Sequence, residues 1–291
     1  MKEIVILSGK GGTGKTTMAL NILNKYDSKV AGDADVDAAD MFIMLGPEII
    51  TKGDFMSNGT ARINTDKCAG CGICAKLCRF GAITCNPGEK YVKINEISCE
   101  GCGLCEIACP EKAARVVPEK SGEWYISKTA GGTFLHARLI PGSENSGRLV
   151  AKVKESARNS AAKEKADYII LDGPPGIGCP AIAAMSGADF VMIVTEPTMS
   201  GVHDLKRIQG LAGHFKIKTG IVVNKSDINE DITKEIEKYC AAKNIPVLGK
   251  IVYDKCLNKA INQKKLPYTE CGQFRKSIDE IYGKLDSLVK N

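Results

Sequence analysis

The sequence predicts an α/β protein that has a mostly parallel β-sheet covered by helices, with a small inserted α+β domain. Three observations lead to this prediction. An apolar run near the N-terminus ends in a glycine-rich loop that opens a helix, later apolar runs alternate with helical segments, and a cysteine-rich repeat interrupts that alternation. Buried parallel strands read as continuous apolar runs joined by helices. We therefore expect a host domain in two parts, residues 1–60 and 121–291, around an inserted domain at residues 61–120.

The first strand and helix are predicted at the N-terminus. The run EIVILS (residues 3–8) is apolar and leads into the glycine-rich segment SGKGGTGKTT (residues 8–17). The next residues show the spacing of a helix, with apolar side chains at Met18, Leu20, Ile22 and Leu23. Strand, glycine-rich loop and helix in this order form the context that a phosphate-binding loop requires.

The remaining host elements follow from apolar runs and helical periodicity. Strands are expected at residues 29–33, 122–127, 132–140, 168–172, 190–195, 217–224 and 245–252, and helices at 147–166 and 230–243. Residues 277–290 place five apolar side chains on one helical face: Ile278, Ile281, Leu285, Leu288 and Val289. Acidic and basic residues share the other face, so we expect this helix to pack on the host core and not on a membrane surface.

The inserted segment is built from a repeated cysteine pattern. C-x2-C-x2-C-x3-C occurs twice, and the second copy lies 31 residues after the first, counted from Cys68 to Cys99. The chain has 13 cysteines in 291 residues, and it begins directly with a strand, from which we expect a cytoplasmic protein. Clustered cysteines in a reducing compartment indicate metal or redox chemistry rather than disulfides. Zinc sites need four ligands and do not explain a third cysteine at the same spacing in both copies, so iron–sulfur clusters are expected.

This stretch resembles bacterial-type ferredoxins with two [4Fe–4S] clusters. In those proteins the fourth cysteine of each run binds the other cluster. The resemblance implies two ligand sets: Cys68, Cys71, Cys74 and Cys109 for the first cluster, and Cys99, Cys102, Cys105 and Cys78 for the second. The proline that usually follows the fourth cysteine is present as Pro110, but Arg79 takes its place after Cys78. Cys85 lies outside the pattern and is expected to be a small buried side chain.

Composition excludes two classes of partner. The formal net charge of +6 falls to about +2 if eight thiolates hold two clusters. A nucleic-acid surface therefore has no support from net charge, and no basic stripe with interleaved aromatic residues is present. No apolar run approaches the roughly 18 residues of a membrane span. We expect neither nucleic acid nor a membrane as partner.

The glycine-rich loop matches G-x4-G-K-[ST] at residues 9–16. Backbone N–H groups of such a loop hold phosphate oxygens, its lysine reaches the β- and γ-phosphates, and its hydroxyl binds Mg²⁺. Lys15 and Thr16 are the corresponding residues here. The predicted nucleotide-binding segment is Gly9, Lys10, Gly11, Gly12, Thr13, Gly14, Lys15, Thr16 and Thr17.

A second lysine makes this motif more specific. Lys10 follows the first glycine of the loop, and this arrangement resembles the deviant Walker A loop of the P-loop ATPases that include MinD, ParA, the Mrp/Nbp35 cluster carriers and the nitrogenase iron protein. The resemblance implies a MinD-like P-loop NTPase fold and a nucleotide-dependent homodimer. It also implies that Lys10 is catalytic and reaches the phosphates bound by the partner, as an arginine finger does.

Other segments resemble the same group of ATPases. The segment GDADVDAAD (residues 32–40) is similar to its first switch, which implies that Asp35 orients or deprotonates the attacking water and that Asp33 lies near Mg²⁺. The segment YIILDGPPGIG (168–178) is similar to its Walker B and second switch, which implies that Asp172 holds Mg²⁺ through water. Asn224, at the end of an apolar run, is similar to the asparagine that contacts adenine.

A third cluster is not expected. Cys179 lies seven residues after Asp172, where the nitrogenase iron protein has one ligand of its intersubunit cluster. That protein needs a second cysteine upstream, and this chain has none between Cys109 and Asp172. The Mrp/Nbp35 carriers use a C-terminal C-x2-C, and Cys240, Cys256 and Cys271 are too far apart in the sequence to form one.

The combination predicts an Mg²⁺-dependent ATPase with two [4Fe–4S] clusters. The leading hypothesis is that a nucleotide-dependent dimer switch is coupled to electron transfer to a redox partner. The alternative is an ATPase that assembles or carries iron–sulfur clusters or metallocofactors for a client protein. A positioning ATPase of the MinD or ParA type is the third hypothesis. Loss of iron during turnover would separate assembly from electron transfer.

Overall fold

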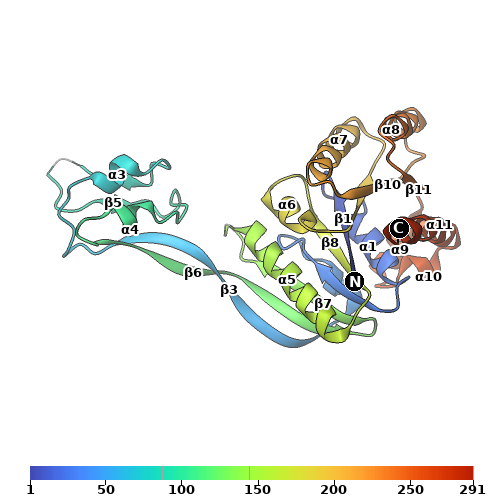
Figure 1. Ribbon diagram of the computed structural model, residues 1–291, viewed down its shortest axis with the longest axis horizontal. Helices are drawn as coiled ribbons and strands as arrows, with labels where there is room; N and C mark the ends of the chain where they lie inside the picture. The colour runs from blue at the N-terminus through green and yellow to red at the C-terminus, as the bar shows by residue number, and fades with distance from the viewer. Residues whose placement is uncertain (87, 144, 291) are drawn as a thin grey trace. The chain divides into compact units, whose positions relative to one another are not determined.

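The computed structural model describes residues 1–86, 88–143 and 145–290 (Figure 1). Internal contacts divide the chain into two compact units. The first comprises Met1–Gly53 and Glu123–Asn291, and the second comprises Asp54–Gly122. Within the described ranges, no helix is both long enough and apolar enough to cross a membrane.

A large sheet organises the first unit, and its central strands are parallel. Its order is β11-β10-β9-β1-β8-β2-β7-β6-β3, and the parallel pairs join β1 to β8 and β9, β2 to β7 and β8, and β10 to β9 and β11. The strands are β1 (Lys2–Ser8), β2 (Lys29–Asp33), β3 (Glu48–Ile63), β6 (Ala114–Thr129), β7 (Gly132–Leu139), β8 (Tyr168–Pro175), β9 (Phe190–Thr195), β10 (Lys218–Asn224) and β11 (Val247–Ile251). The mostly parallel α/β fold that the sequence predicted is confirmed.

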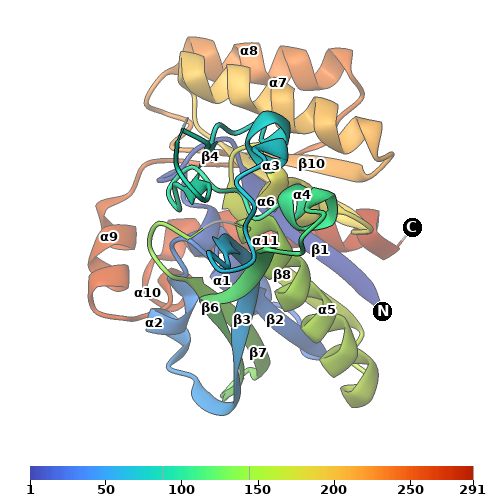
Figure 2. The same cartoon turned by 90° about the vertical axis from the view of Figure 1, so that its left-hand side faces the viewer.

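Helices cover both faces of this sheet. Figure 1 shows α5 (Ser146–Glu164), α6 (Cys179–Met185) and α7 (Met199–His214) on one face, and α1 (Lys15–Leu23), α10 (Pro267–Glu270) and α11 (Gly272–Lys290) on the other. The helix α8 (Glu230–Ala242) lies beside α7, as Figures 1 and 2 both show. The short helix α2 (Met41–Leu45) follows β2, and α9 (Lys255–Asn262) follows β11.

Elements near both ends of the chain, β1 and α11, pack in the core of the first unit. Strand β1 is buried from Glu3 to Ser8, because it lies in the middle of the sheet between two parallel neighbours. Helix α11 buries one face against the same core, through Phe274, Ile278, Ile281, Leu285 and Val289. The packing role predicted for this C-terminal helix is therefore confirmed, and its apolar face is not available to a membrane surface.

Strand β3 was not predicted from the sequence. It runs for 16 residues from Glu48 to Ile63, and β6 also has 16 residues and includes Pro118. Each of these strands begins in one unit and ends in the other. Residues 48–52 of β3 are exposed and Ala61 is its one buried residue, so the strand lacks the apolar alternation by which a half-buried strand is found in a sequence.

The second unit repeats a loop-and-helix element. The helix α3 (Ile73–Leu77) starts after Gly72, and α4 (Leu104–Ala108) starts after Gly103. Both glycines have a positive φ, 71° and 78°, which a residue with a Cβ adopts only at a cost. The strands β4 (Ile83–Thr84) and β5 (Lys93–Ile94) pair antiparallel. A small core of Cys74, Ile83 and Val92 holds this unit together.

One expectation for this unit is wrong. Cys85 was predicted to be buried, but it is exposed, and its Sγ lies 3.5 Å from the carbonyl oxygen of Gly70. It follows the two-residue strand β4 directly, where the small core has already ended, so no apolar layer covers it.

Candidate functional site

The glycine-rich loop lies at the carboxyl edge of the parallel strands, between β1 and α1. Gly14 adopts φ 88° before α1 begins at Lys15. A Cβ on Gly14 would come within 2.5 Å of Nδ2 of Asn224, so the loop and the end of β10 approach too closely for a larger residue. Nδ2 of Asn224 donates a hydrogen bond of 2.8 Å to the carbonyl oxygen of Thr13. The loop is thus fixed to the strand that carries the predicted adenine contact.

Lys15 lies in a buried group of carboxylates. Its Nζ donates to Oδ1 of Asp172 at 2.8 Å and to Oδ2 of Asp35 at 3.3 Å, and only 6% of its side chain is exposed. Burial opposes its charge, yet the carboxylates of Asp172 and Asp35 raise the pKa of Lys15 above its usual value. Lys15 therefore stays positively charged although it is buried. A lysine that binds phosphate needs this charge.

Burial also shifts the pKa values of the carboxyl groups around Lys15. Burial raises the pKa of Asp172 and of Asp35, and the ammonium of Lys15 opposes both shifts. Asp33 is fully buried, and burial together with the charge of Asp172 raises its pKa well above the usual value. Its oxygens accept hydrogen bonds of 3.1 Å from the backbone N–H groups of Asp35 and Met41. Asp33 therefore fixes the backbone of the segment that follows β2, at Asp35 and Met41.

One atom in this group has no partner. Oδ2 of Asp172 is buried and forms no hydrogen bond with the described residues, and the nearby side chain of Thr16 lowers the pKa of the same carboxyl group. A buried oxygen without a partner calls for an ion or a water. Mg²⁺ prefers such oxygen ligands together with phosphate oxygens, so the residues present fit a nucleotide-bound Mg²⁺ at Asp172 and Thr16.

A cavity of about 550 Å³ opens beside these groups. This volume falls within the range of small-ligand sites. Its lining combines residues of the glycine-rich loop and carboxylates of residues 35–40 with apolar residues of α9 and α11. Its lining includes Gly11, Gly12, Gly14, Lys15, Thr16, Thr17, Asp35, Asp37, Asp40, Pro174, Asn224, Tyr253, Leu257, Ile261 and Phe274. The predicted residues Asp35 and Asn224 thus lie on the same cavity as Lys15.

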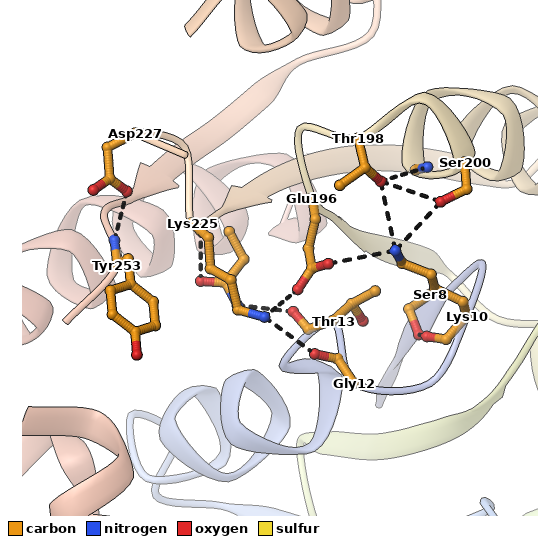
Figure 3. Close-up of polar contacts among 12 residues, drawn as sticks. Ser8, Lys10, Gly12, Thr13, Glu196, Thr198, Ser200, Lys225, Asp227 and Tyr253 are labelled. Carbon is orange, nitrogen blue, oxygen red and sulfur yellow. Dashed lines mark hydrogen bonds and ion pairs between the residues drawn. The ribbon is translucent and has the colours of Figure 1, made fainter. Parts of the chain in front are cut away.

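Lys10 is directed away from this cavity. Its Nζ lies 3.6 Å from Oε2 of Glu196 and donates to the hydroxyls of Ser200 at 3.3 Å and Thr198 at 3.5 Å (Figure 3). Glu196 also pairs with Nζ of Lys225, which contacts the carbonyl oxygen of Gly12 at 3.5 Å. Glu196 and Lys225 were not predicted from the sequence, although both immediately follow strands, β9 and β10.

Most of the repeated cysteines lie near one another in the second unit. A cavity there is lined by Cys78, Cys99, Cys102 and Cys105, with Cys74 beside them. Burial raises the pKa of Cys74, and the neighbouring thiols of Cys109 and Cys68 raise it further. Two thiols also accept backbone hydrogen bonds, Cys99 from Ala61 at 3.4 Å and Cys109 from Ala113 at 3.3 Å. Sulfurs that converge and accept N–H groups fit iron–sulfur ligands.

Two of the three C-terminal cysteines, which are too far apart in the sequence for a C-x2-C motif, form a disulfide that the sequence did not predict. Cys256 and Cys271 form a disulfide with Cα atoms 5.9 Å apart. Cys240 is a buried free thiol in α8, and Cys179 is an exposed free thiol at the start of α6. Sequence spacing concealed the pair, because a helix, a turn and a second helix bring position 271 back to position 256.

The sheet, the loop and the buried lysine define a P-loop nucleotide-binding protein. The family described as "CobQ/CobB/MinD/ParA nucleotide binding domain" matches residues 4–268. The chain belongs to this family. An uncharacterized protein of Methanocaldococcus jannaschii, MJ0578, is 32% identical over 292 residues, which cover 99% of this chain and 97% of that protein.

Relatives with named roles are more distant. The septum site-determining protein MinD of Bacillus subtilis is 31% identical over 131 residues, 43% of this chain and 48% of that protein. The solved structure of MinD from Pyrococcus horikoshii, complexed with Mg-ADP, superimposes with a TM-score of 0.58 at 17% identity and covers 99% of this chain and 96% of that one. That likeness shows the MinD-like fold.

Proposed function

We propose that this chain is an Mg²⁺-dependent ATPase whose nucleotide-driven dimerisation controls electron transfer through two [4Fe–4S] clusters in the second unit. The observation that supports the proposal is that one chain carries both a buried lysine among carboxylates at a glycine-rich loop and repeated cysteines that lie near one another. Family membership supports the nucleotide site and is silent on the cysteines.

The nucleotide chemistry follows from the residues of the first unit. The amides of the loop and Lys15 bind the phosphates, and the ammonium that now pairs with Asp35 and Asp172 neutralises phosphate charge instead. Asp172 and Thr16 are placed to hold Mg²⁺, which supplies further charge neutralisation. Asp35 lies on the cavity with a raised pKa, and a carboxylate there orients the attacking water and accepts its proton. Lys10 serves the partner's site.

The second unit supplies ligands and an exit for electrons. Cys68, Cys71, Cys74 and Cys109 would hold one cluster, and Cys99, Cys102, Cys105 and Cys78 the other. Such clusters transfer single electrons when bound. Cys71 and Cys102 are exposed, so each predicted ligand set reaches the surface of its unit. Strands β3 and β6 connect this unit to the switch-bearing unit through the backbone.

A test of the proposal uses protein purified without oxygen. We expect about eight iron and eight sulfide per chain and a reducible paramagnetic signal, and we expect ATP to change the rate at which the reduced protein passes electrons to a soluble acceptor. The Asp172→Asn variant should keep the iron and lose the ATP effect. Stoichiometric zinc without a reducible signal would refute the clusters. An ATP effect that is unchanged in Asp172→Asn would refute the coupling.

A second candidate is a positioning ATPase, which the named MinD relatives favour. This function would use the same ATP site and dimer, and it would give the clusters no part in turnover. It predicts ATP-dependent sedimentation of the protein with anionic phospholipid vesicles. The burial of the apolar face of α11 argues against that helix as the anchor. If iron-free protein binds the vesicles as well as iron-loaded protein does, the result would favour a positioning ATPase over electron transfer.

A further inference from the structure

The disulfide between Cys256 and Cys271 joins two segments whose neighbouring residues line the nucleotide cavity. Cys256 is the second residue of α9, and Cys271 joins α10 to α11. From α9, Leu257, Asn258 and Ile261 line the cavity, and Phe274 lines it from α11. The bond therefore links two elements that contribute to the same cavity.

The two linked elements are held very differently. The corner between α10 and α11 is fixed by hydrogen bonds: the N–H of Tyr268 donates to Oδ1 of Asn21 in α1 at 2.9 Å, and Arg275 donates to the carbonyl oxygens of Tyr268 and Thr269 at 2.8 and 2.7 Å. In α9, by contrast, Ala260 is the single buried residue within the helix bounds. A helix with so little burial opens at low free energy unless something else holds it.

The two sulfurs of the disulfide differ in how far their residues are exposed. Cys271 is 2% exposed and belongs to the core, whereas Cys256 is partly exposed at the core's margin. Cys256 lies in the first turn of α9, behind the capping carboxylate of Asp254, which accepts its backbone N–H at 2.7 Å. When the bond is open, Cys256 is the thiol that a reagent reaches first. The other eleven cysteines of the chain form no disulfide.

We propose that Cys256 and Cys271 form a thiol–disulfide exchange site whose oxidation fixes α9 against the nucleotide cavity and slows nucleotide release. The co-reactant is a low-molecular-weight disulfide. The Cys256 thiolate attacks one of its sulfurs and displaces the first small thiol, and the Cys271 thiolate then attacks the mixed disulfide and displaces the second. The two protein thiols lose two electrons and two protons, which the small disulfide takes up to become two thiols.

The inference rests on nucleotide binding at this cavity and does not depend on the clusters or on electron transfer. The expected effect on release follows from the restraint that the disulfide places on the chain. The bond joins residues with a sequence separation of 15, and a cross-link that closes a loop of this length strongly restricts the conformations of the segment once it opens. In the reduced protein α9 opens more often, so the part of the cavity wall that α9 contributes is lost more often and the nucleotide leaves sooner.

The test measures release of a fluorescent ADP analogue from the full-length protein, purified without oxygen and equilibrated either with dithiothreitol or with oxidised glutathione. We expect release to be at least about threefold slower after oxidation, below the roughly 100-fold limit set by cross-linking a loop of this length. Alkylation followed by mass spectrometry should find Cys256 and Cys271 blocked only in the reduced sample. The Cys256→Ala and Cys271→Val variants should release at the fast rate under both conditions.

Two matched variants serve as controls. Cys240→Ser removes a buried free thiol, Cys179→Ser removes an exposed one, and both should keep the redox dependence of release. The proposal would be overturned if oxidised wild-type protein with a verified disulfide released the analogue as fast as reduced protein. That result would leave the proposed nucleotide binding intact, since both samples would still bind the analogue. Redox dependence that persists in Cys256→Ala would also overturn it. So would stoichiometric zinc on the reduced pair, because Asp254 lies close enough to complete a metal site.

Discussion

Lys15 and Lys10 lie in the same loop but in opposite environments, and replacing each with alanine should reveal the difference. Lys15 is 6% exposed and pairs with two buried carboxylates, whereas the side chain of Lys10 is 36% exposed and pairs with Glu196. Removing one partner of a buried ion pair leaves uncompensated charge and costs about 3–5 kcal/mol. Removing an exposed partner costs at most about 1 kcal/mol.

The predicted effects can be measured as thermal shifts. For a unit of this size, each kcal/mol corresponds to about 2–4 °C in Tm, so nucleotide-free Lys15→Ala should melt roughly 10 °C below wild type and Lys10→Ala within about 4 °C of it. The one tryptophan, Trp124, belongs to the first unit and reports its unfolding. Equal shifts for the two variants would refute the assignment of Lys15 as a buried, paired cation.

The destabilisation of Lys15→Ala should also depend on pH. The pKa values of Asp35, Asp172 and Asp33 are raised in the folded protein, and loss of Lys15 raises those of Asp35 and Asp172 further. A raised carboxyl pKa means that the folded state binds more protons than the unfolded state, so stability falls as pH rises above the unfolded pKa of about 4. The gap between variant and wild type should therefore narrow from pH 8 toward pH 5. A gap independent of pH would contradict this explanation.

Three further predictions concern function. Asp172→Asn should abolish Mg²⁺-dependent phosphate release from ATP with iron content unchanged, and loss of iron from the soluble variant would contradict the separation of the two sites. Cys102→Ala should lower iron by about four per chain relative to Cys85→Ala; equal iron in both would refute the ligand set. Lys10→Ala and Asp35→Ala should each be inactive alone, yet their heterodimer should recover up to about half the wild-type rate, because one site keeps its Asp35 and receives Lys10 from the partner. An inactive mixture with demonstrated heterodimers would refute the trans role.

Local sequence was sufficient for the elements that position the nucleotide site. The strand, loop and helix around Lys15 follow from apolar runs and glycines, and the burial of β1 and α11 follows from their patterns. Spatial proximity was harder to predict. Asp35 and Asp172 were each identified from a motif, but their shared contact with Lys15 depends on β2 and β8 being neighbours in the sheet. No local signal specifies that order.

The failures have a common physical origin. Cys256 and Cys271 pair because α9 and α10 fold back on each other, a tertiary effect that the sequence separation of 15 conceals. Strand β3 joins the sheet through backbone hydrogen bonds to β6, and few of its side chains are buried. Its sequence therefore shows no alternation of apolar and polar residues. The eight repeated cysteines were found easily because metal-ligand spacing is itself local.

The contacts of Lys10 bear on how a dimer would form. If Lys10 reaches the partner's phosphates, it must leave Glu196, Thr198 and Ser200. The ion pair is partly exposed and therefore worth at most about 1 kcal/mol, and the hydroxyls can turn to water. Glu196 does not become an unpaired charge when Lys10 leaves, because Lys225 stays paired with it. The contacts of Lys10 are therefore weak, and little free energy is lost when its side chain leaves them.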